Sequence, residues 1–293
     1  MNSCLLGLVL LAQLLAAPEP VRYASQGLVE DKRSDYPLAL LQAALAASDG
    51  HYPLVETASA LKQNRALKLL AENQYIDVVW SMTSVEREQD LLPMRVPIFM
   101  GLEGARVMLI HREQQARFNE RLADGLLRRM LIGQGHDWVD ADILEQNGFS
   151  VMRTASYLGL FNLLEQKRID GFARNVIEIG EEARLMAPRE LVIETSWLLY
   201  YPTANYFFVS TENVKLATAI EQGLLRLLHS GAMQQMLAEY YADDLARLAL
   251  AERQLVRLHN RQLPPGTPIA NSVLWHPLVQ TWLQQSGTAV ATD

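Results

Sequence analysis

Short runs of β-branched and apolar residues alternate along the chain with longer segments whose apolar residues recur every three or four positions. The runs at 20–25, 51–59 and 75–82 predict strands, and the segments at 36–48 and 61–73 predict helices between them. Strands that alternate with helices of this length are typical of a parallel sheet covered by helices. The first part of the chain is therefore predicted to be an α/β unit.

A second α/β unit is predicted after residue 111. A short strand at 96–99 and an apolar run at 104–111 lead into it, and strands and helices then alternate again from 112 to 198. An apolar run at 204–210 leads back towards the first unit. Helices follow this run, and we expect the last of them to reach about residue 260.

Composition limits the classes of partner. With 293 residues, 49% hydrophobic and 20% charged, the chain is large enough to form two hydrophobic cores. Its net charge is −7, and its 26 Lys and Arg residues are scattered instead of clustered. Nucleic acid selects basic surfaces, so no nucleic-acid partner is predicted.

The N-terminal segment predicts export. An uninterrupted apolar run at 5–17 has the length of a signal-peptide core and is too short to span a bilayer comfortably. We expect a signal peptide at 1–17 and a periplasmic location, and an uncleaved membrane anchor is the alternative. Cys4 precedes the run and is the only cysteine, so the exported chain would have neither a disulfide nor a thiol nucleophile.

Small hydroxyl residues and an arginine follow the third predicted strand. Ser81 and Thr83 leave the carboxyl end of this strand, where ligands dock in open α/β sheets. Arg87 follows within a few residues, and a guanidinium can hold a carboxylate through two parallel hydrogen bonds. The alternative interpretation is an exposed arginine between Glu86 and Glu88.

The stretch YIDVVWSMTSVEREQDLLPMRVPIF at 75–99 resembles the first-lobe binding segment of the family 3 periplasmic solute-binding proteins, which serve amino-acid-type ABC transporters. In that family a strand leads through Ser and Thr residues to an E-R pair and then to a proline-bearing strand. The order of predicted elements agrees with the family from about residue 20 to residue 241. The resemblance implies a two-lobed α/β protein with the periplasmic binding protein type 2 fold, in which two hinge strands cross between the lobes.

The resemblance also divides the chain into parts. Lobe one is expected at 18–106 plus 205–260, and lobe two at 107–204. Residues 261–293 are expected to form a C-terminal extension that packs on lobe one and ends in a disordered tail. The two connections between the lobes would form a hinge with a ligand cleft beneath it.

Positions of the family's ligand residues imply a site in this cleft. In lobe one, Arg87 would anchor an anionic group of the ligand, while Ser81 and Thr83 would donate hydrogen bonds. In lobe two, the turn at Gly135 and His136 would present backbone N–H groups from the start of a helix. The alternative for this turn is that an aspartate at position 137 caps the helix itself.

Arg174 and Asn175 are expected to select the ligand. Asn175 stands five residues after Asp170, where amino-acid binders of the family place an Asp that receives the ligand's ammonium group. A neutral amide gives no Coulomb attraction to an ammonium, although Glu178 is a candidate substitute. The cleft is therefore expected to prefer an anionic or neutral polar molecule.

Four aromatic residues are candidates for the walls of the cleft, and packing in a core is the alternative for each. They are Tyr23, Tyr36, Trp80 and Tyr157.

The predicted function is capture of a small polar or anionic organic molecule by hinge closure, without catalysis, cofactor or metal. The six His residues lack metal-ligand spacing, and the chain has no G-x-S-x-G motif. A monomer is expected, with a membrane permease for ABC-type uptake or a sensor protein as its partner. The alternatives are a periplasmic sensing or interaction module without transport, and a dehydratase-like enzyme with Glu178 as general acid.

Overall fold

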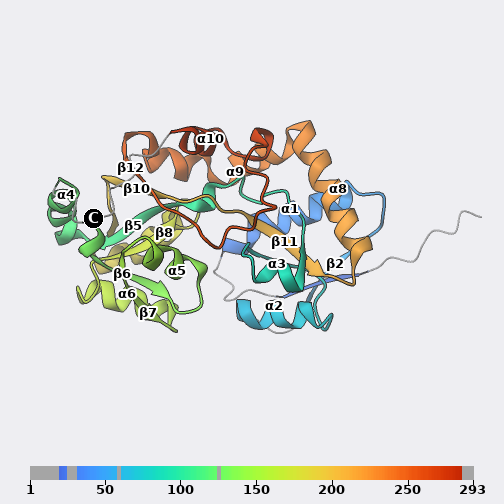
Figure 1. The fold of residues 1–293 in the computed structure, drawn as a ribbon, viewed down its shortest axis with the longest axis horizontal. Helices are drawn as coiled ribbons and strands as arrows, with labels where there is room; N and C mark the ends of the chain where they lie inside the picture. Colours follow the sequence, from blue (N-terminus) through green and yellow to red (C-terminus); the bar gives the residue numbers. More distant parts are fainter. Residues whose placement is uncertain (1–19, 25–31, 58–60, 124–126, 286–293) are drawn as a thin grey trace, which may run out of the picture.

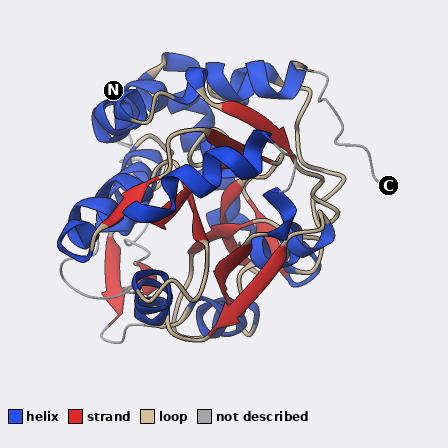
Figure 2. Cartoon of the chain, turned by 90° about the vertical axis from the view of Figure 1, so that its left-hand side faces the viewer, coloured by secondary structure: helices blue, strands red, loops and turns tan. Residues whose placement is uncertain are grey.

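Two lobes with separate sheets make up the molecule (Figure 1). The structure, a computed structural model, describes residues 20–24, 32–57, 61–123 and 127–285. The predicted signal peptide and the predicted disordered tail lie outside these residues. Strands lie in the interior of the molecule and helices on its outside (Figure 2), as expected of an α/β fold. None of the described helices has both the length and the apolar content needed to cross a membrane.

Lobe one is built on two small sheets that meet at Tyr23. Its strands are β1 (Val21–Ala24), β2 (Leu54–Thr57), β3 (Val79–Met82), β4 (Leu91–Pro93) and β11 (Asn205–Ser210). β1 and β2 are parallel, and β11 runs antiparallel between β3 and β4. A single bridge from Tyr23 to Val78 joins the two sheets.

Helices cover the sheets of lobe one and fix the position of the cleft wall. They are α1 (Asp35–Ala46), α2 (Gln63–Ala71), α3 (Arg87–Asp90), α8 (Val214–Ser230) and α9 (Ala232–Arg247). α8 packs closely on α1 because Gly223 faces the backbone of Ala44. A Cβ atom at Gly223 would lie 1.9 Å from the carbonyl oxygen of Ala44, so only glycine permits this approach.

Lobe two is built on one mixed sheet of seven strands. These are β5 (Ala105–His111), β6 (Leu131–Gly135), β7 (Ser150–Thr154), β8 (Gly171–Asn175), β9 (Leu191–Ile193), β10 (Trp197–Tyr200) and β12 (Gln254–Arg257). Their order is β12-β10-β5-β8-β6-β7, with β9 paired to β5. The helices of this lobe are α4 (Gln115–Ala123), α5 (Val139–Gln146), α6 (Tyr157–Glu165) and α7 (Ile179–Met186).

Two connections cross between the lobes and touch each other. The first leads through Gly104 into β5, and the second runs from Tyr201 to the start of β11. The backbone N–H of Tyr201 donates a hydrogen bond of 3.2 Å to the carbonyl oxygen of Gly104. A Cβ atom at Gly104 would lie 2.3 Å from the carbonyl oxygen of Tyr201, so the contact requires glycine. The predicted two-lobed fold with two crossing hinge segments is confirmed.

Two elements differ from the sequence-based expectation. Residues 96–99 form no strand, because Pro97 lacks the N–H group that a ladder needs, and β4 pairs with β11 instead. The helix predicted to reach about residue 260 ends at Arg247. Ala249 has a φ of 47°, outside the helical range, and the chain then forms β12 at the edge of the lobe-two sheet. Pairing with the free edge of the lobe-two sheet therefore determines the conformation of this segment, where local propensity alone does not decide between helix and strand.

The C-terminal segment after β12 is hydrogen-bonded to both lobes. On lobe two, Asn147, the residue that follows α5, donates a hydrogen bond to the carbonyl oxygen of His259 and accepts one from its N–H, each at 2.8 Å. Gln262 donates through its side chain to Asp142 at 2.9 Å, and its carbonyl oxygen accepts from the N–H of Val85 in lobe one at 3.1 Å. The lobe boundaries remain a prediction, but this segment links the two sides.

Farther along, the chain packs on lobe one. The N–H of His276 donates to the carbonyl oxygen of Met100, and the ring of Trp275 is buried against Gly101. α10 (Pro277–Gln284) follows and lies with α9 along the upper side of Figure 1.

We predict that Asn147→Ala lowers the free energy of unfolding by about 1–2 kcal/mol, because it removes both hydrogen bonds to His259. Urea denaturation measures this change. Asn64→Ala, at an exposed position of α2 without a side-chain hydrogen bond in the described part of the chain, is the matched control. Equal stability of the two variants would show that the contact to the C-terminal segment does not stabilise the fold.

Candidate functional site

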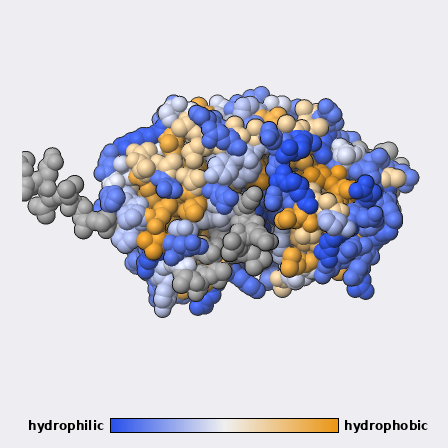
Figure 3. Space-filling view, turned by 180° about the vertical axis from the view of Figure 1, so that it is seen from behind, coloured by the Kyte–Doolittle hydropathy of each residue, from blue (hydrophilic) through white to orange (hydrophobic). Residues whose placement is uncertain are grey.

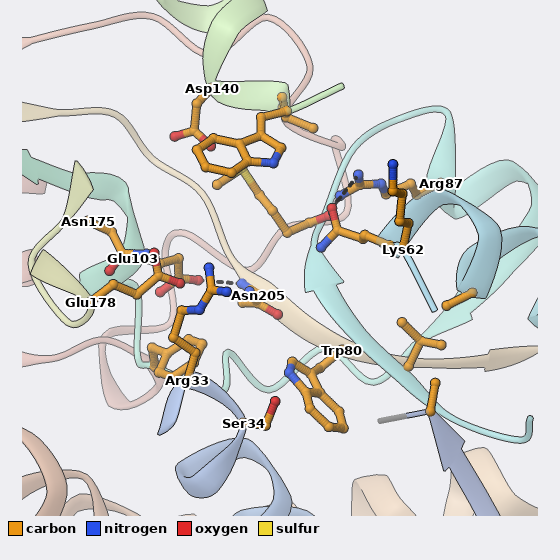
Figure 4. Close-up of a pocket in the computed structure, with 18 of the residues that line it drawn as sticks. Arg33, Ser34, Lys62, Trp80, Arg87, Glu103, Asp140, Asn175, Glu178 and Asn205 are labelled. Carbon is orange, nitrogen blue, oxygen red and sulfur yellow. Dashed lines mark hydrogen bonds between the residues drawn. The ribbon is translucent and has the colours of Figure 1, made fainter. Parts of the chain in front are cut away.

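A cavity of about 440 Å³ lies between the lobes, within the size range of small-molecule pockets. The face seen in Figure 3 is hollowed between the two halves of the molecule, and hydrophilic residues lie beside the hollow. Figure 4 shows charged and amide side chains from both lobes around the cavity. Its polar and aromatic lining residues are Arg33, Ser34, Lys62, Gln63, Trp80, Arg87, Phe99, Glu103, Arg106, Trp138, Asp140, Arg174, Asn175, Glu178 and Asn205.

Arg87 is held in the cavity wall by neutral acceptors. β3 ends at Met82 and the first turn of α3 begins at Arg87, which brings the side chain back towards the strand. Its Nη1 donates to Ser81 Oγ at 2.8 Å and to the carbonyl oxygen of Met82 at 2.5 Å, and Nη2 donates to Gln63 Oε1 at 3.3 Å. Among the described residues no carboxylate forms an ion pair with this guanidinium. Neutral acceptors therefore fix the orientation of the guanidinium, but no counter-ion within the described residues compensates its charge.

Burial lowers the pKa of Arg87, while Glu86 and Asp140 oppose this shift. A guanidinium does not lose its proton in proteins, so the cost of burial is borne as an unmatched charge. An anion that entered the cavity would supply the missing counter-charge.

Ser81 and Thr83 lie behind the cavity wall. Both side chains are fully buried, and neither residue lines the cavity. Ser81 supports Arg87, as described above. Thr83 Oγ1 donates to Glu88 Oε1 at 2.5 Å, and Glu88 forms an ion pair of 2.5 Å with Arg95. The structure therefore places both hydroxyls where they position charged groups, whereas the sequence predicted direct contact with the ligand.

Arg174 lines the cavity but is already paired. It forms ion pairs of 2.5 Å with both Glu178 and Glu182, and its guanidinium carbon lies 5.0 Å from the ring centroid of Trp138. Burial alone would lower its pKa, but Glu182 and Glu178 outweigh burial and raise the pKa well above its ordinary value. Tyr157 donates to Glu182 at 2.6 Å. With two carboxylates on one guanidinium, this cluster does not attract an anion as the sequence led us to expect.

Asn175 lines the cavity beside this cluster. Its Oδ1 accepts a hydrogen bond of 3.1 Å from the backbone N–H of Ile177. Its Nδ2 makes no hydrogen bond within the described ranges, so the amide retains donors for a ligand. A donor at this position suits an acceptor group of the ligand and not an ammonium.

The cleft contains more carboxylates than the sequence predicted. Asp140 lines the cavity and forms an ion pair of 2.5 Å with Arg106. Glu103 also lines it, is 2% exposed, and accepts a hydrogen bond from the backbone N–H of Asn205. Burial raises the pKa of Glu103 to about 7. Glu178 was the one carboxylate placed at the cleft from the sequence, and the structure adds Asp140 and Glu103 to it. A lone acid within the apolar stretch MGLEGARVMLI was the signal that could have revealed Glu103.

Five other predicted residues lie off the cavity lining: Tyr23, Tyr36, Gly135, His136 and Tyr157, whose hydroxyl group is bound to Glu182. Tyr36 is fully buried and donates to the carbonyl oxygen of Ile98 at 3.0 Å, so it belongs to the core of lobe one. Tyr23 lies on β1, away from the cavity lining. His136 has an exposed side chain, and its backbone N–H donates to the carbonyl oxygen of Thr154 at 3.0 Å, so this N–H is not available to a ligand.

Gly135 lies under the ring of Trp138, where a Cβ atom would come within 2.6 Å of the indole. Trp138 stacks on Phe172 with ring centroids 6.1 Å apart and forms the aromatic wall on the lobe-two side. Trp80 lines the lobe-one side, as predicted from the sequence. The described residues contain no group of three or more His, Cys, Asp or Glu that could hold a metal ion.

Comparison with known proteins identifies the fold. No protein-family model and no curated protein sequence matches the chain. Solved structures do match it. The Salmonella typhimurium periplasmic binding protein with high arginine specificity is 16% identical, with a TM-score of 0.57, over 76% of this chain and 100% of its own. The probable amino-acid ABC transporter extracellular-binding protein of Bacillus subtilis is 15% identical, with a TM-score of 0.59, over 78% and 100%.

The chain shares the two-lobed fold of these binding proteins. The ligand-binding core of GluR0 from Nostoc punctiforme, solved with L-glutamate, also has this fold. It is 16% identical, with a TM-score of 0.54, over 76% of this chain and 99% of its own. The fold expected from the family 3 resemblance is thus confirmed. At these identities the comparison shows the fold and does not name the ligand.

The pKa of Glu103 gives a pH-dependent prediction for the ligand-free protein. Between its ordinary value of 4.5 and the folded value of about 7, the folded state retains a proton that the unfolded chain has lost. This carboxyl group therefore reduces stability as the pH rises through that window, with no further change above it. Glu103→Gln keeps an acceptor for Asn205 N–H and removes the titration. The variant should gain on the order of 3 kcal/mol relative to wild type between pH 4.5 and 8.

Urea denaturation at several pH values measures this difference. Glu221→Gln, at an exposed position of α8, is the control and should follow wild type at every pH. Parallel curves for wild type and Glu103→Gln would show that Glu103 does not titrate in this range.

Proposed function

We propose that the chain is a solute-binding protein that captures a small polar or anionic organic molecule between its lobes. The observation that supports this most directly is Arg87, a guanidinium that lines the cavity and is oriented by neutral acceptors only. Keeping a partly buried cation without a counter-ion is costly, and a ligand carboxylate would satisfy it through two parallel hydrogen bonds. Binding, and not turnover, is the function that this geometry favours.

A second cation adds to this end of the cavity. Lys62 precedes the first residue of α2, forms no ion pair among the described residues, and lies beside Arg87 in Figure 4. The first turn of α2 contains no acidic residue, so the positive end of its dipole is not offset by a side chain. We call Lys62, Arg87 and the start of α2 the anion end of the cavity.

Hinge closure is supported by contacts across the cleft. Both lobes contribute lining residues. The guanidinium carbon of Arg33, in lobe one, lies 5.0 Å from the ring centroid of Tyr157, in lobe two. A ligand bound between the lobes would thus contact groups that come together only when the cleft is closed.

The neighbours in fold support an uptake role and leave a sensing role open. They include a periplasmic binding protein with high arginine specificity, a probable amino-acid ABC transporter binding protein, and a GluR0 ligand-binding core in complex with L-glutamate. We infer ABC-type uptake in the periplasm, after export by the predicted signal peptide at 1–17, with a permease as partner. The dehydratase-like alternative is weakened because Glu178, its predicted general acid, is ion-paired with Arg174.

We predict that Arg87→Ala weakens ligand binding by about 2–4 kcal/mol, the scale for losing a charge-assisted partner in a desolvated site. The melting temperature of the ligand-free variant should change by only a few degrees, because the side chain lies at a cavity and not in a core. A thermal-shift screen of amino acids, dicarboxylates, polyamines and aromatic acids would first identify a ligand. Calorimetry would then measure its affinity for the wild type and the variant.

Arg65→Ala is the control, because Arg65 lies on the exposed side of α2 and has no ion pair within the described ranges. It should bind as wild type does. Unchanged affinity of Arg87→Ala would remove this guanidinium from the site.

A further inference from the structure

Three buried side-chain atoms of residues that line the cavity have no hydrogen-bond partner among the described residues. They are Glu103 Oε2, Arg106 Nη1 and Asn205 Oδ1. Buried polar atoms are almost always hydrogen-bonded, because each unsatisfied atom costs about 1–3 kcal/mol. Three such atoms in residues that line one cavity therefore indicate that a further group completes their hydrogen bonds.

The crossing segments hold these residues in place. Glu103 immediately precedes Gly104, Arg106 is the second residue of β5, and Asn205 is the first residue of β11. The backbone N–H of Asn205 donates to Glu103 Oε1, which leaves Oε2 as the free oxygen. We call these three residues the hinge floor.

Arg106 is held in place by Asp140 and Tyr201. Its Nε donates to Asp140 Oδ1 at 2.6 Å and to Tyr201 Oη at 3.0 Å, and Nη2 forms the ion pair with Asp140. Within the described ranges, only Nη1 remains without a partner. The side chain is 3% exposed and has little freedom to turn elsewhere.

When Glu103 is ionised, above its pKa of about 7, the hinge floor presents two acceptors and one donor, and this pattern restricts the group that can bind. A carboxylate would meet Arg106 favourably but would face Glu103 Oε2 and Asn205 Oδ1 without a proton to share. An ammonium would donate to both oxygens but would face the guanidinium of Arg106, a like charge. A hydroxyl has a single proton and would leave one oxygen unsatisfied. A primary carboxamide has two N–H groups and one carbonyl oxygen, which match the set.

We propose that the hinge floor is a subsite for a primary carboxamide of the ligand, with the carbonyl oxygen on Arg106 Nη1 and the NH₂ group on Glu103 and Asn205. This inference rests on the proposed function, since it places the ligand's anionic group at the anion end and its amide at the crossing segments. Ligand and hinge are then joined directly, so that binding stabilises the closed arrangement of the crossing segments.

Short carboxylic acids with matched far ends test the proposal. The probes are succinamate and glutaramate, their isopropyl isosteres 4-methylpentanoate and 5-methylhexanoate, and the diacids succinate and glutarate. Calorimetry at pH 8, where Glu103 is ionised, should show at least tenfold tighter binding of an amide than of its isopropyl isostere, because the isostere leaves three buried polar atoms unpaired. The diacid of the same length should bind more weakly than the amide.

The variant Glu103→Gln exchanges one acceptor of the hinge floor for a donor. In Glu103→Gln the side-chain oxygen must still accept from Asn205 N–H, so an NH₂ group faces the subsite in place of an acceptor. The preference for the amide over its isostere should fall below threefold, and the affinity for the diacid should increase. Glu221→Gln, on the exposed surface of α8, should keep the wild-type preference.

Acetamide, which has no carboxylate, separates this inference from the proposed function. In crystals soaked with acetamide, the amide should lie at the hinge floor in wild type and in Arg87→Ala. If no acid binds but acetamide occupies the floor, the carboxamide subsite stands and capture of an organic anion fails. If the acids bind through Arg87 without preference for an amide, and only an ordered water lies at the floor, the carboxamide subsite is overturned and the proposed function stands.

Discussion

The backbone contact between the two crossing segments determines where the polar groups of the cleft lie. Tyr201 N–H donates to Gly104, and the absence of a side chain at Gly104 allows the strands to approach this closely. Glu103 and Arg106 flank that glycine, so the contact places one acid and one cation at the base of the cleft. A bulkier residue at Gly104 would separate the crossing segments and shift both side chains.

Some cations of the cleft have ion-pair partners among the described residues and others do not, and this difference determines where in the cavity an anion is favoured. Arg106 is paired with Asp140, and Arg174 is paired with two glutamates, so the charges of these two cations are already compensated. Arg87 has only neutral acceptors, and Lys62 has no ion pair within the described part of the chain. An anionic group is thus favoured at one end of the cavity, while buried hydrogen-bonding atoms remain unsatisfied at the other.

The C-terminal segment adds a third link between the lobes. β12 joins the sheet of lobe two, and Trp275 then packs against Gly101 of lobe one. Between them, Gln262 bonds to Asp142 on one side of the cleft and to Val85 on the other. The matched structures cover 76–78% of this chain while almost all of their own length is covered, so part of this chain has no counterpart in them. Movement of the lobes must stretch or break the Gln262 contacts.

Much of the fold and part of the site could be predicted from the sequence. Alternating strand and helix patterns gave the α/β lobes, because they reflect local burial. Arg87 could be placed at the cleft because it follows the carboxyl end of β3, and Trp80 because it lies on that same strand, so both depend on local sequence. Tyr36 could not be assigned to the core, since its burial depends on helices more than a hundred residues away. Glu103 and β12 were missed for the same reason: distant partners determine their environment.

The central claim is that Arg87 binds the anionic group of a small molecule between the lobes. A crystal structure of the protein, purified without denaturation and grown with the tightest ligand from the screen, tests it most directly. The claim predicts an anionic group within about 3 Å of both Nη atoms of Arg87, in a cleft closed by both lobes. A ligand whose anionic group lies elsewhere in the cleft, or binds outside it, would contradict the claim.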